Sequence, residues 1–320
     1  MIRVHRAFLV FLALAGLAFA QVPPAANPPA AAPGPGRGAA FAPIVIGPMA
    51  PVPPEVAIPL PTPAEIGQVN QEVRRLIDSD NSATKPLLTK FESLLMLQPP
   101  RLNVAATYTQ SQQRRGARHE GFVEQAKKGN IDLLLDGDSI TDWWVQNDEK
   151  KAMFDKYFGA YKTANFAIAG DTTQGVLWGL HNGEGQGFQP KAIMLMIGTN
   201  NTGGTDNAGT ATAAEIAEGV GAVVLEMRND FPEAKILLLA VFPRGEPGDS
   251  VRDKIAEINQ LIRKLDDQRH VFYMDIGAKF LDDKGVFLPG AFQPDNLHPT
   301  PKGYDIWGAA VKDKIADLMK

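Results

Sequence analysis

Residues 131–319 alternate between two kinds of segment, and this alternation constrains the fold more than any other feature of the sequence. One kind is a short, nearly continuous apolar run, found at residues 131–135, 163–168, 192–197, 235–241 and 271–275. The other is an amphipathic stretch of helical length, found at about residues 149–158, 173–180, 210–230, 250–268 and 302–319. Short apolar runs are typical of parallel strands buried on both faces, and alternating strands and helices form right-handed crossover units. The sequence therefore predicts an α/β fold, a three-layer α/β/α sandwich with a central, mostly parallel five-stranded sheet.

The extreme N-terminus has the pattern of a cleavable signal peptide over residues 1–20. Basic Arg3 and Arg6 precede an apolar stretch, and Ala18-Phe19-Ala20 is an A-x-A cleavage site. An uncleaved membrane anchor is the alternative, although the apolar stretch is short for a bilayer span. We therefore expect a secreted or periplasmic protein with no stable membrane insertion after signal cleavage.

The next part of the chain differs in composition from the predicted sandwich. Residues 21–63 hold 14 of the 25 prolines and only two charged side chains, which predicts an extended, disordered linker. Residues 64–117 include two amphipathic segments, at 64–78 and 84–95, and are interpreted as an N-terminal helical appendage. This division leaves residues 118–320 for the α/β domain.

Charge and composition argue against several classes of partner. The formal net charge is −4, so the chain lacks the basic excess typical of proteins that bind nucleic acid or anionic membranes. It contains no Cys, which excludes disulfides, and it has no paired-histidine zinc motif, P-loop or dinucleotide-binding glycine motif. We expect neither a metal nor a cofactor, and no nucleic-acid partner.

Four short motifs carry the side chains that acyl transfer requires. Three of them follow predicted strands, and the fourth lies in a proline-bounded loop before the last helix. They are Gly137-Asp138-Ser139-Ile140, Asn165-Phe166-Ala167-Ile168-Ala169-Gly170-Asp171, Gly198-Thr199-Asn200-Asn201 and Asp295-Asn296-Leu297-His298. Because ligands bind at the carboxyl ends of parallel strands, we expect the first three motifs to meet at one edge of the sheet.

Each motif can be interpreted as part of an active site or as a purely structural feature. Ser139 has the position of a nucleophile, or of a helix N-cap. Gly170 and Asn200 are suited to donate N–H groups to an oxyanion, or to shape their loops; Asn201 could take the place of Asn200. The three-residue spacing of Asp295 and His298 lets the carboxylate orient the imidazole as a general base.

Other aromatic and histidine side chains near these motifs have a weaker case for a catalytic or substrate-binding role. His119 lies beside Arg118 and Glu120 and is interpreted as a member of a structural ion-pair network. Trp143, Trp144 and Trp178 follow the first two motifs and would either stack on a sugar or pack in the core.

Together the four motifs resemble those of the SGNH hydrolases, the GDSL-type esterase/lipase family. Within it, "GDSITDWW", "NFAIAGDTTQGVLW" and "GTNN" look most like the catalytic subunits of platelet-activating-factor acetylhydrolase and secreted bacterial relatives. The resemblance implies a flavodoxin-like fold for residues 118–320. It implies catalytic Ser139, His298 and Asp295, and an oxyanion hole from the N–H groups of Ser139 and Gly170 and the side chain of Asn200.

The sequence thus predicts a serine esterase that hydrolyses small acyl esters. Acetyl groups on a carbohydrate are the leading substrate, because of the export signal, the tryptophans and the lack of a lid-like apolar segment. A lysophospholipase, thioesterase or arylesterase on the same residues is one alternative. A glycan-binding envelope protein whose catalytic site has lapsed is the other.

Overall fold

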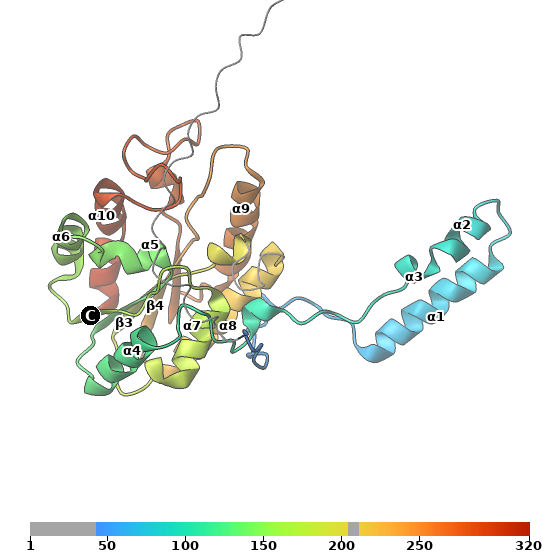
Figure 1. Cartoon of the computed structure of the whole chain (residues 1–320), viewed down its shortest axis with the longest axis horizontal. Helices are drawn as coiled ribbons and strands as arrows, with labels where there is room; N and C mark the ends of the chain where they lie inside the picture. Colours follow the sequence, from blue (N-terminus) through green and yellow to red (C-terminus); the bar gives the residue numbers. More distant parts are fainter. Residues whose placement is uncertain (1–42, 204–210) are drawn as a thin grey trace, which may run out of the picture. The chain divides into compact units, whose positions relative to one another are not determined.

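The computed structural model describes residues 43–203 and 211–320 (Figure 1). The predicted signal peptide and the first half of the predicted linker lie outside the described residues. No helix in the described part of the chain is long and apolar enough to cross a membrane.

The centre of the domain is a five-stranded, entirely parallel sheet. Its order is β2-β1-β3-β4-β5, and each strand falls within or overlaps one of the predicted apolar runs. The strands are β1 Leu133–Gly137, β2 Thr163–Asn165, β3 Ala192–Met196, β4 Lys235–Leu239 and β5 Val271–Met274. The order reverses between β1 and β3, which pair with each other, so the switch point of the sheet lies at their carboxyl ends.

Alternate side chains of the strands enter two separate cores. Leu134, Leu195 and Leu238 belong to one buried cluster, whereas Leu135, Met194 and Leu237 belong to the other. This alternation follows from the period of two in a strand. Helices cover both faces, so the predicted three-layer α/β/α sandwich is confirmed (Figure 1).

Two sets of helices form the outer layers. The first cluster packs beneath α4 Ala117–Lys128, α7 Thr173–Gly179, α8 Ala213–Asp230 and α9 Ser250–Ile262. The second packs beneath α5 Ser139–Asp142, α6 Asp148–Phe158 and α10 Pro301–Leu318. Shorter helical turns join these elements at η1 Val104–Ala106, η2 Trp143–Val145, η3 Leu180–Glu184, η4 Asn200–Thr202, η5 Arg263–Leu265 and η6 Gly277–Phe280.

The boundary of the α/β domain differs from the one expected from composition. Ala50 and Val56 are buried although they lie in the predicted linker, and Arg114 is fully buried although it lies in the predicted appendage. Glu218 of α8 accepts hydrogen bonds from both segments: from the N–H of Ile58 at 2.7 Å and from Asn103 Nδ2 at 2.8 Å. The domain therefore includes residues on either side of a helical segment, because isolated apolar residues in an extended chain can pack without a periodic pattern.

The helical segment between them is a hairpin. Its helices are α1 Pro63–Ser79, α2 Lys85–Lys90 and α3 Glu92–Leu95, and they coincide with the two predicted amphipathic stretches. Thr62 and Glu65 form a capping box at the start of α1, with Pro63 in the first turn. We refer to residues 63–97 as the helical hairpin.

Candidate active site

Ser139 lies in a tight turn between β1 and α5. Gly137, the last residue of β1, has φ = 154°, and a Cβ atom there would stand 2.3 Å from the carbonyl oxygen of Met196. Asp138 caps α5 by accepting a hydrogen bond from the N–H of Ile140 at 3.0 Å. Ser139 is therefore the first residue of the helix and not its cap, which leaves its hydroxyl available to another partner.

That partner is His298. Its Nε2 lies 2.9 Å from Ser139 Oγ, and its Nδ1 lies 2.6 Å from Asp295 Oδ2. The second oxygen of Asp295 accepts backbone hydrogen bonds from Leu297 and His298, both at 3.0 Å. Burial opposes ionisation of this carboxyl, but the hydrogen bonds from His298 and the backbone hold the pKa of Asp295 below its usual range. The side chains form an unbroken chain from a carboxylate through an imidazole to a hydroxyl.

The loop that carries Gly170 is fastened to the turn that carries Ser139. Asp142 of α5 accepts a hydrogen bond from the N–H of Ala169 at 3.0 Å and forms an ion pair with Arg118 at 2.8 Å. Asn165 donates to the carbonyl oxygen of Thr141 at 2.9 Å. Gly170 has φ = 81°, a left-handed conformation that side chains with a Cβ atom rarely adopt. The backbone here therefore favours glycine over any other residue.

Asn200 and Asn201 have different environments. Asn200 Nδ2 donates to the carbonyl oxygen of Asp171 at 2.8 Å, which uses one of the two N–H bonds of the amide. Asn201 is fully buried: its side chain accepts from the N–H of Thr173 at 3.1 Å and donates to Gln174 at 3.0 Å. Asn201 therefore holds the start of α7. Asn200 keeps the second N–H of its amide for another acceptor.

Trp143 and Lys150 form a second layer behind the imidazole. The ring of Trp143 stacks on His298 with centroids 4.0 Å apart and planes 25° apart. Lys150 Nζ lies 5.2 Å from the centre of the Trp143 ring and 5.3 Å from that of Tyr304. Burial lowers the pKa of Lys150, and its ammonium donates to Gln146 at 2.8 Å. The role of Lys150 has no local signal in the sequence, because Trp143 lies seven positions before it and Tyr304 comes from α10.

A buried ion-pair network lies beneath the Gly170 loop. The guanidinium of Arg114 is fully buried and pairs with Asp136 at 3.1 Å, Asp171 at 2.5 Å and Glu184. His119 Nδ1 lies 2.7 Å from Glu184, as expected for a structural role. Burial disfavours the charged form of Arg114, but these carboxylates outweigh it and raise its pKa. Because Asp171 follows Gly170 and its carbonyl holds Asn200, Arg114 fixes the geometry of both.

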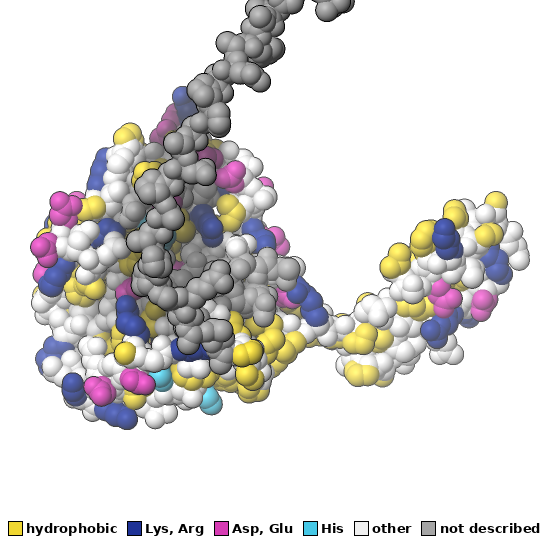
Figure 2. Space-filling model, viewed as in Figure 1, with side chains coloured by type: hydrophobic (Ala, Val, Ile, Leu, Met, Phe, Trp, Pro, Cys, Tyr) yellow, Lys and Arg dark blue, Asp and Glu magenta, His cyan; other side chains and the backbone are white. Residues whose placement is uncertain are grey.

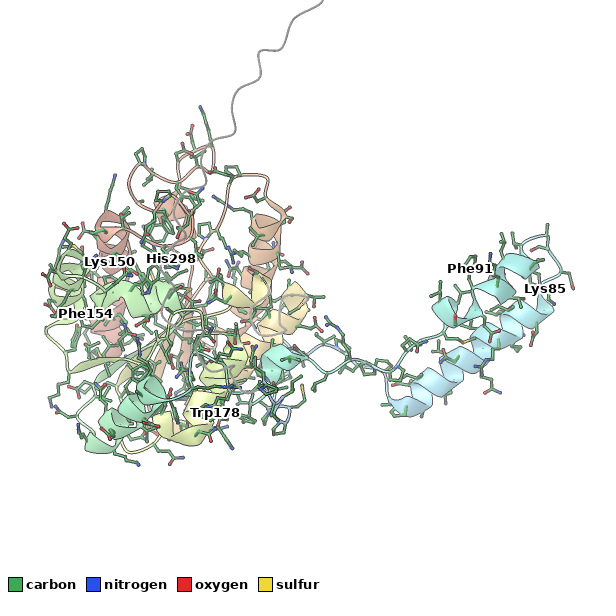
Figure 3. The ribbon with its side chains drawn as sticks, viewed as in Figure 1. Lys85, Phe91, Lys150, Phe154, Trp178 and His298 are labelled. Atoms are coloured by element: carbon green, nitrogen blue, oxygen red, sulfur yellow. The ribbon has the colours of Figure 1, made fainter. Side chains whose placement is uncertain are left out.

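The three tryptophans have separate positions. Trp144 is fully buried in the second core cluster and is a packing residue. Trp178 is half-buried and lies 4.7 Å from the ring of His119 (Figure 3). Trp143 is the only one of the three that contacts a predicted site residue.

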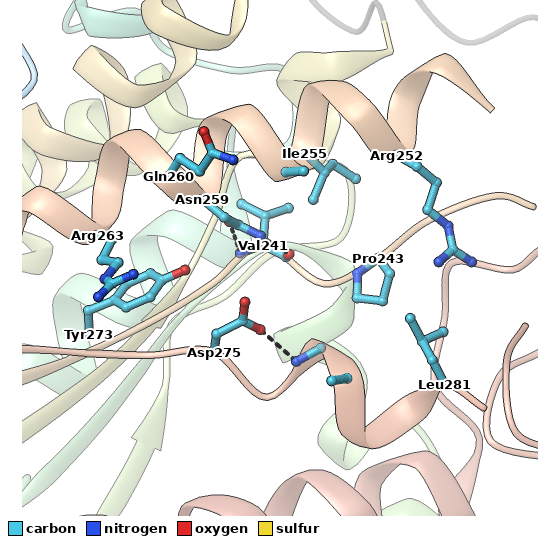
Figure 4. Close-up of a pocket in the computed structure, with 13 residues that line it drawn as sticks. Val241, Pro243, Arg252, Ile255, Asn259, Gln260, Arg263, Tyr273, Asp275 and Leu281 are labelled. Atoms are coloured by element: carbon cyan, nitrogen blue, oxygen red, sulfur yellow. Dashed lines mark hydrogen bonds between the residues drawn. The ribbon is translucent and has the colours of Figure 1, made fainter. Parts of the chain in front are cut away.

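A separate surface pocket lies between α9 and the segment after β5 (Figure 4). It has a volume of about 520 Å³ and includes Tyr273, Arg252 and Arg263 in its lining. None of the predicted site residues lines it. Arg252 donates to the carbonyl oxygen of Gly245 at 2.8 Å, so this side chain supports the loop beside the pocket.

Comparison with known proteins identifies the class. The model of the GDSL-like lipase/acylhydrolase family matches residues 137–306. Platelet-activating factor acetylhydrolase IB subunit alpha2 of Rattus norvegicus is 36% identical over 208 residues, which is 64% of this chain and 85% of that protein. The alpha1 subunit of Homo sapiens is 30% identical over 187 residues, 58% of this chain and 76% of that protein.

Solved structures agree on the fold. A putative platelet activating factor from Streptococcus pneumonia has a TM-score of 0.50 at 22% identity, over 62% of this chain and 92% of that one. A GDSL-like lipase from Bacteroides thetaiotaomicron has a TM-score of 0.50 at 19% identity, over 62% and 97%.

The matched motifs and the fold define a carboxylic ester hydrolase. The chain belongs to the GDSL-like lipase/acylhydrolase family, whose members are also called SGNH hydrolases.

Proposed function

We propose that this protein is an exported serine esterase that removes small acyl groups, acetyl above all, from hydroxyl groups of a carbohydrate. The observation that carries the proposal is the hydrogen-bond chain from Asp295 through His298 to Ser139. The loops of Gly170 and Asn200, fastened to the same edge of the sheet, support it.

In the proposed mechanism His298 Nε2 takes the hydroxyl proton of Ser139 while Oγ attacks the ester carbonyl carbon. The carbonyl oxygen becomes an oxyanion, which the backbone N–H groups of Ser139 and Gly170 and the second amide N–H of Asn200 stabilise. His298 then gives the proton to the departing alkoxide, and the alcohol leaves an acyl-enzyme on Ser139.

Deacylation uses the same groups in the same order. Water attacks the acyl carbon as His298 removes its proton, and the returning proton releases Ser139 and the free carboxylic acid. Asp295 stays ionised throughout and stabilises the imidazolium that forms twice in each cycle. The lowered pKa of Asp295 supports this assignment.

The substrate is inferred from several observations. The relatives are named acetylhydrolases, which favours an acetyl group. The predicted export signal favours an acceptor outside the cytoplasm, such as an acetylated polysaccharide, and half-buried Trp178 offers an aromatic side chain on which a sugar ring can pack. The signal peptide predicted over residues 1–20 supports an enzyme that acts outside the cytoplasm.

The test is hydrolysis of p-nitrophenyl acetate by the full chain, followed by acetate release from acetylated xylan. Ser139→Ala should lower kcat by about a thousandfold or more. Ser93→Ala, an exposed serine of the helical hairpin, is the matched control and should retain full activity. Equal activity in wild type and Ser139→Ala, or no activity in either, would exclude the proposed nucleophile and favour a glycan-binding protein.

A series of p-nitrophenyl esters separates the alternatives on the same site. Highest kcat/KM with the acetyl ester supports deacetylation, and preference for a long acyl chain supports a lysophospholipase or thioesterase. Acetate release from an acetylated phospholipid but not from xylan would replace the sugar acceptor by a lipid.

A further inference from the structure

A glutamine side chain with an unpartnered oxygen lies against the loop of Gly170. A Cβ atom on Gly170 would stand 3.2 Å from Nε2 and 3.4 Å from Cγ of Gln113. The Oε1 atom of the same amide is buried and has no hydrogen-bond partner among the described residues. Buried polar side-chain atoms are nearly always hydrogen-bonded, so an unpartnered amide beside a predicted oxyanion donor calls for a ligand.

Buried neighbours hold Gln113 in this position. Ser111 is buried, and its hydroxyl accepts a hydrogen bond from the N–H of Arg114 at 3.2 Å. The guanidinium of Arg114 is fully buried and pairs at 2.5 Å with Asp171, the residue after Gly170. Gln113 therefore lies between two buried anchors, and its amide can bind a ligand without the cost of ordering a loop first.

The amide of Gln113 suits a hydroxyl group. The residue is half-buried, so part of its side chain is open to solvent. A side-chain amide has N–H donors at one end and a carbonyl acceptor at the other, and a hydroxyl group, which donates and accepts, can pair with either end. An apolar alcohol bound in the same place would shield the amide from water and leave it unpartnered, which is unfavourable.

The other side of the nucleophile is polar as well. Because β1 lies between β2 and β3, the loop of Gly170 and the turn of Asn200 lie on either side of it. Arg244 adjoins the second: its Nη1 donates to the carbonyl oxygen of Thr199 at 3.2 Å and to the hydroxyl of Thr202 at 3.3 Å. Its Nη2 atom makes no hydrogen bond within the described residues, so Arg244 is a second donor available to a ligand.

The charges near the site favour a ligand without charge. Glu246, two residues after Arg244, accepts a hydrogen bond from Asn296 Nδ2 at 2.6 Å, so a carboxylate and a guanidinium share one loop. On the part of the catalytic domain that Figure 2 shows, basic and acidic side chains are interspersed. A hydroxyl group can pair with an amide, a guanidinium or a carboxylate, whereas an anion is repelled by the carboxylate.

We propose that Gln113 determines the specificity of the site by hydrogen bonding to a free hydroxyl group of the alcohol that carries the ester. The substrate class is then a partly acylated polyhydroxyl compound, such as a sugar with a hydroxyl group next to the esterified one. This inference rests on the proposed function and assigns a residue that recognises its acceptor. The family model begins at residue 137, so Gln113 lies outside the segment that the model matches.

The test compares two acetyl esters with rings of the same size. One is a mono-O-acetyl ester of methyl xyloside, which has free hydroxyl groups, and the other is cyclohexyl acetate, which has none. Acetate release by the full chain gives kcat/KM for each ester, and the measured quantity is the ratio of the sugar ester to cyclohexyl acetate. Gln113→Met keeps the length of the side chain and should lower this ratio about three- to tenfold, mainly through a higher KM for the sugar ester.

The neighbouring glutamine supplies a matched control. Gln112 is exposed, and Gln112→Met should leave the ratio unchanged. Gln113→Glu keeps oxygen acceptors at the same length and should recover part of the ratio that Gln113→Met loses. The Tm of each variant shows that it is folded. Arg244 is left intact, because its Nη1 also holds the turn of Asn200.

A ratio that Gln113→Met leaves unchanged would overturn the inference, whether the two esters are hydrolysed normally or lose activity in equal proportion. A wild type that hydrolyses cyclohexyl acetate but not the sugar ester would overturn it too. Failure of the proposed function looks different. The wild type would then release no Ser139-dependent acetate from either ester or from p-nitrophenyl acetate, and the inference would fall with it.

Discussion

At the scale of single residues, the stack of Trp143 on His298 sets the plane of the imidazole. Its two nitrogens point to Ser139 and Asp295, and a rotation of the ring would lengthen both contacts. Trp143→Ala removes this support and should lower kcat by about three- to tenfold with little change in KM, since an aromatic pair contributes about 0.5–1.5 kcal/mol. Trp143→Phe keeps an aromatic face and should restore most of the loss. Steady-state kinetics on p-nitrophenyl acetate measure both, and a rise in KM with unchanged kcat would mean that Trp143 only binds substrate.

Asp138 is the second residue with a specific prediction. Burial raises its pKa to about 7, and its Oδ2 atom has no partner among the described residues. A carboxyl whose pKa is higher in the folded than in the unfolded chain binds its proton more tightly when folded, so stability falls as pH rises from about 4 to 7. Asp138→Asn keeps a cap acceptor and removes this loss.

The measurement is the Tm of wild type and Asp138→Asn between about pH 4 and 8. The difference should move in favour of the variant as pH rises from about 4 to 7 and level off above pH 7. Asp136, whose pKa burial also raises to about 7, titrates in both proteins and cancels in the difference. A difference independent of pH would show that Asp138 has an ordinary pKa.

At the scale of elements, the short helix α5 positions the loop of Gly170 as well as the nucleophile. Asp142 reaches from α5 to the N–H of Ala169, one residue before Gly170. Asp142→Ala should therefore displace the Gly170 N–H and lower kcat by about tenfold or more, because small misplacements of catalytic groups are costly. Asp155→Ala, which removes only the exposed pair with Lys151, is the control and should leave kcat unchanged. Equal kcat in both variants would show that the loop holds its shape without α5.

The same element explains why part of the site was predictable and part was not. Ser139, Gly170 and Asn200 each follow a strand, and parallel strands bring their carboxyl ends together, so the motifs could be placed from local pattern alone. Asp142 could have been noticed three residues after Ser139, but nothing in the sequence indicates that its partner is Ala169. Hydrogen bonds between loops depend on backbone direction, which periodicity does not report.

At the scale of the whole molecule, the five strands and both helical layers follow from hydrophobic pattern, and the structure confirms them. The boundary of the α/β domain could not be predicted from the hydrophobic pattern. Arg114 pairs with carboxylates 22, 57 and 70 positions further along the chain, and no local signal connects them. Residues 43–62 looked like a linker because prolines hide any period, yet Ala50 and Val56 are buried.

Glu218 gives the hairpin an unusual connection to the rest of the chain. One of its oxygens holds Ile58 before the hairpin, and the other holds Asn103 after it. The hairpin is therefore an insertion with two anchored ends and not a tail. A protease that cut it once would leave both stumps attached to α8 and the catalytic core intact. Because one side chain holds both ends of the hairpin, a change in the hairpin's length need not move Ile58 or Asn103 relative to α8.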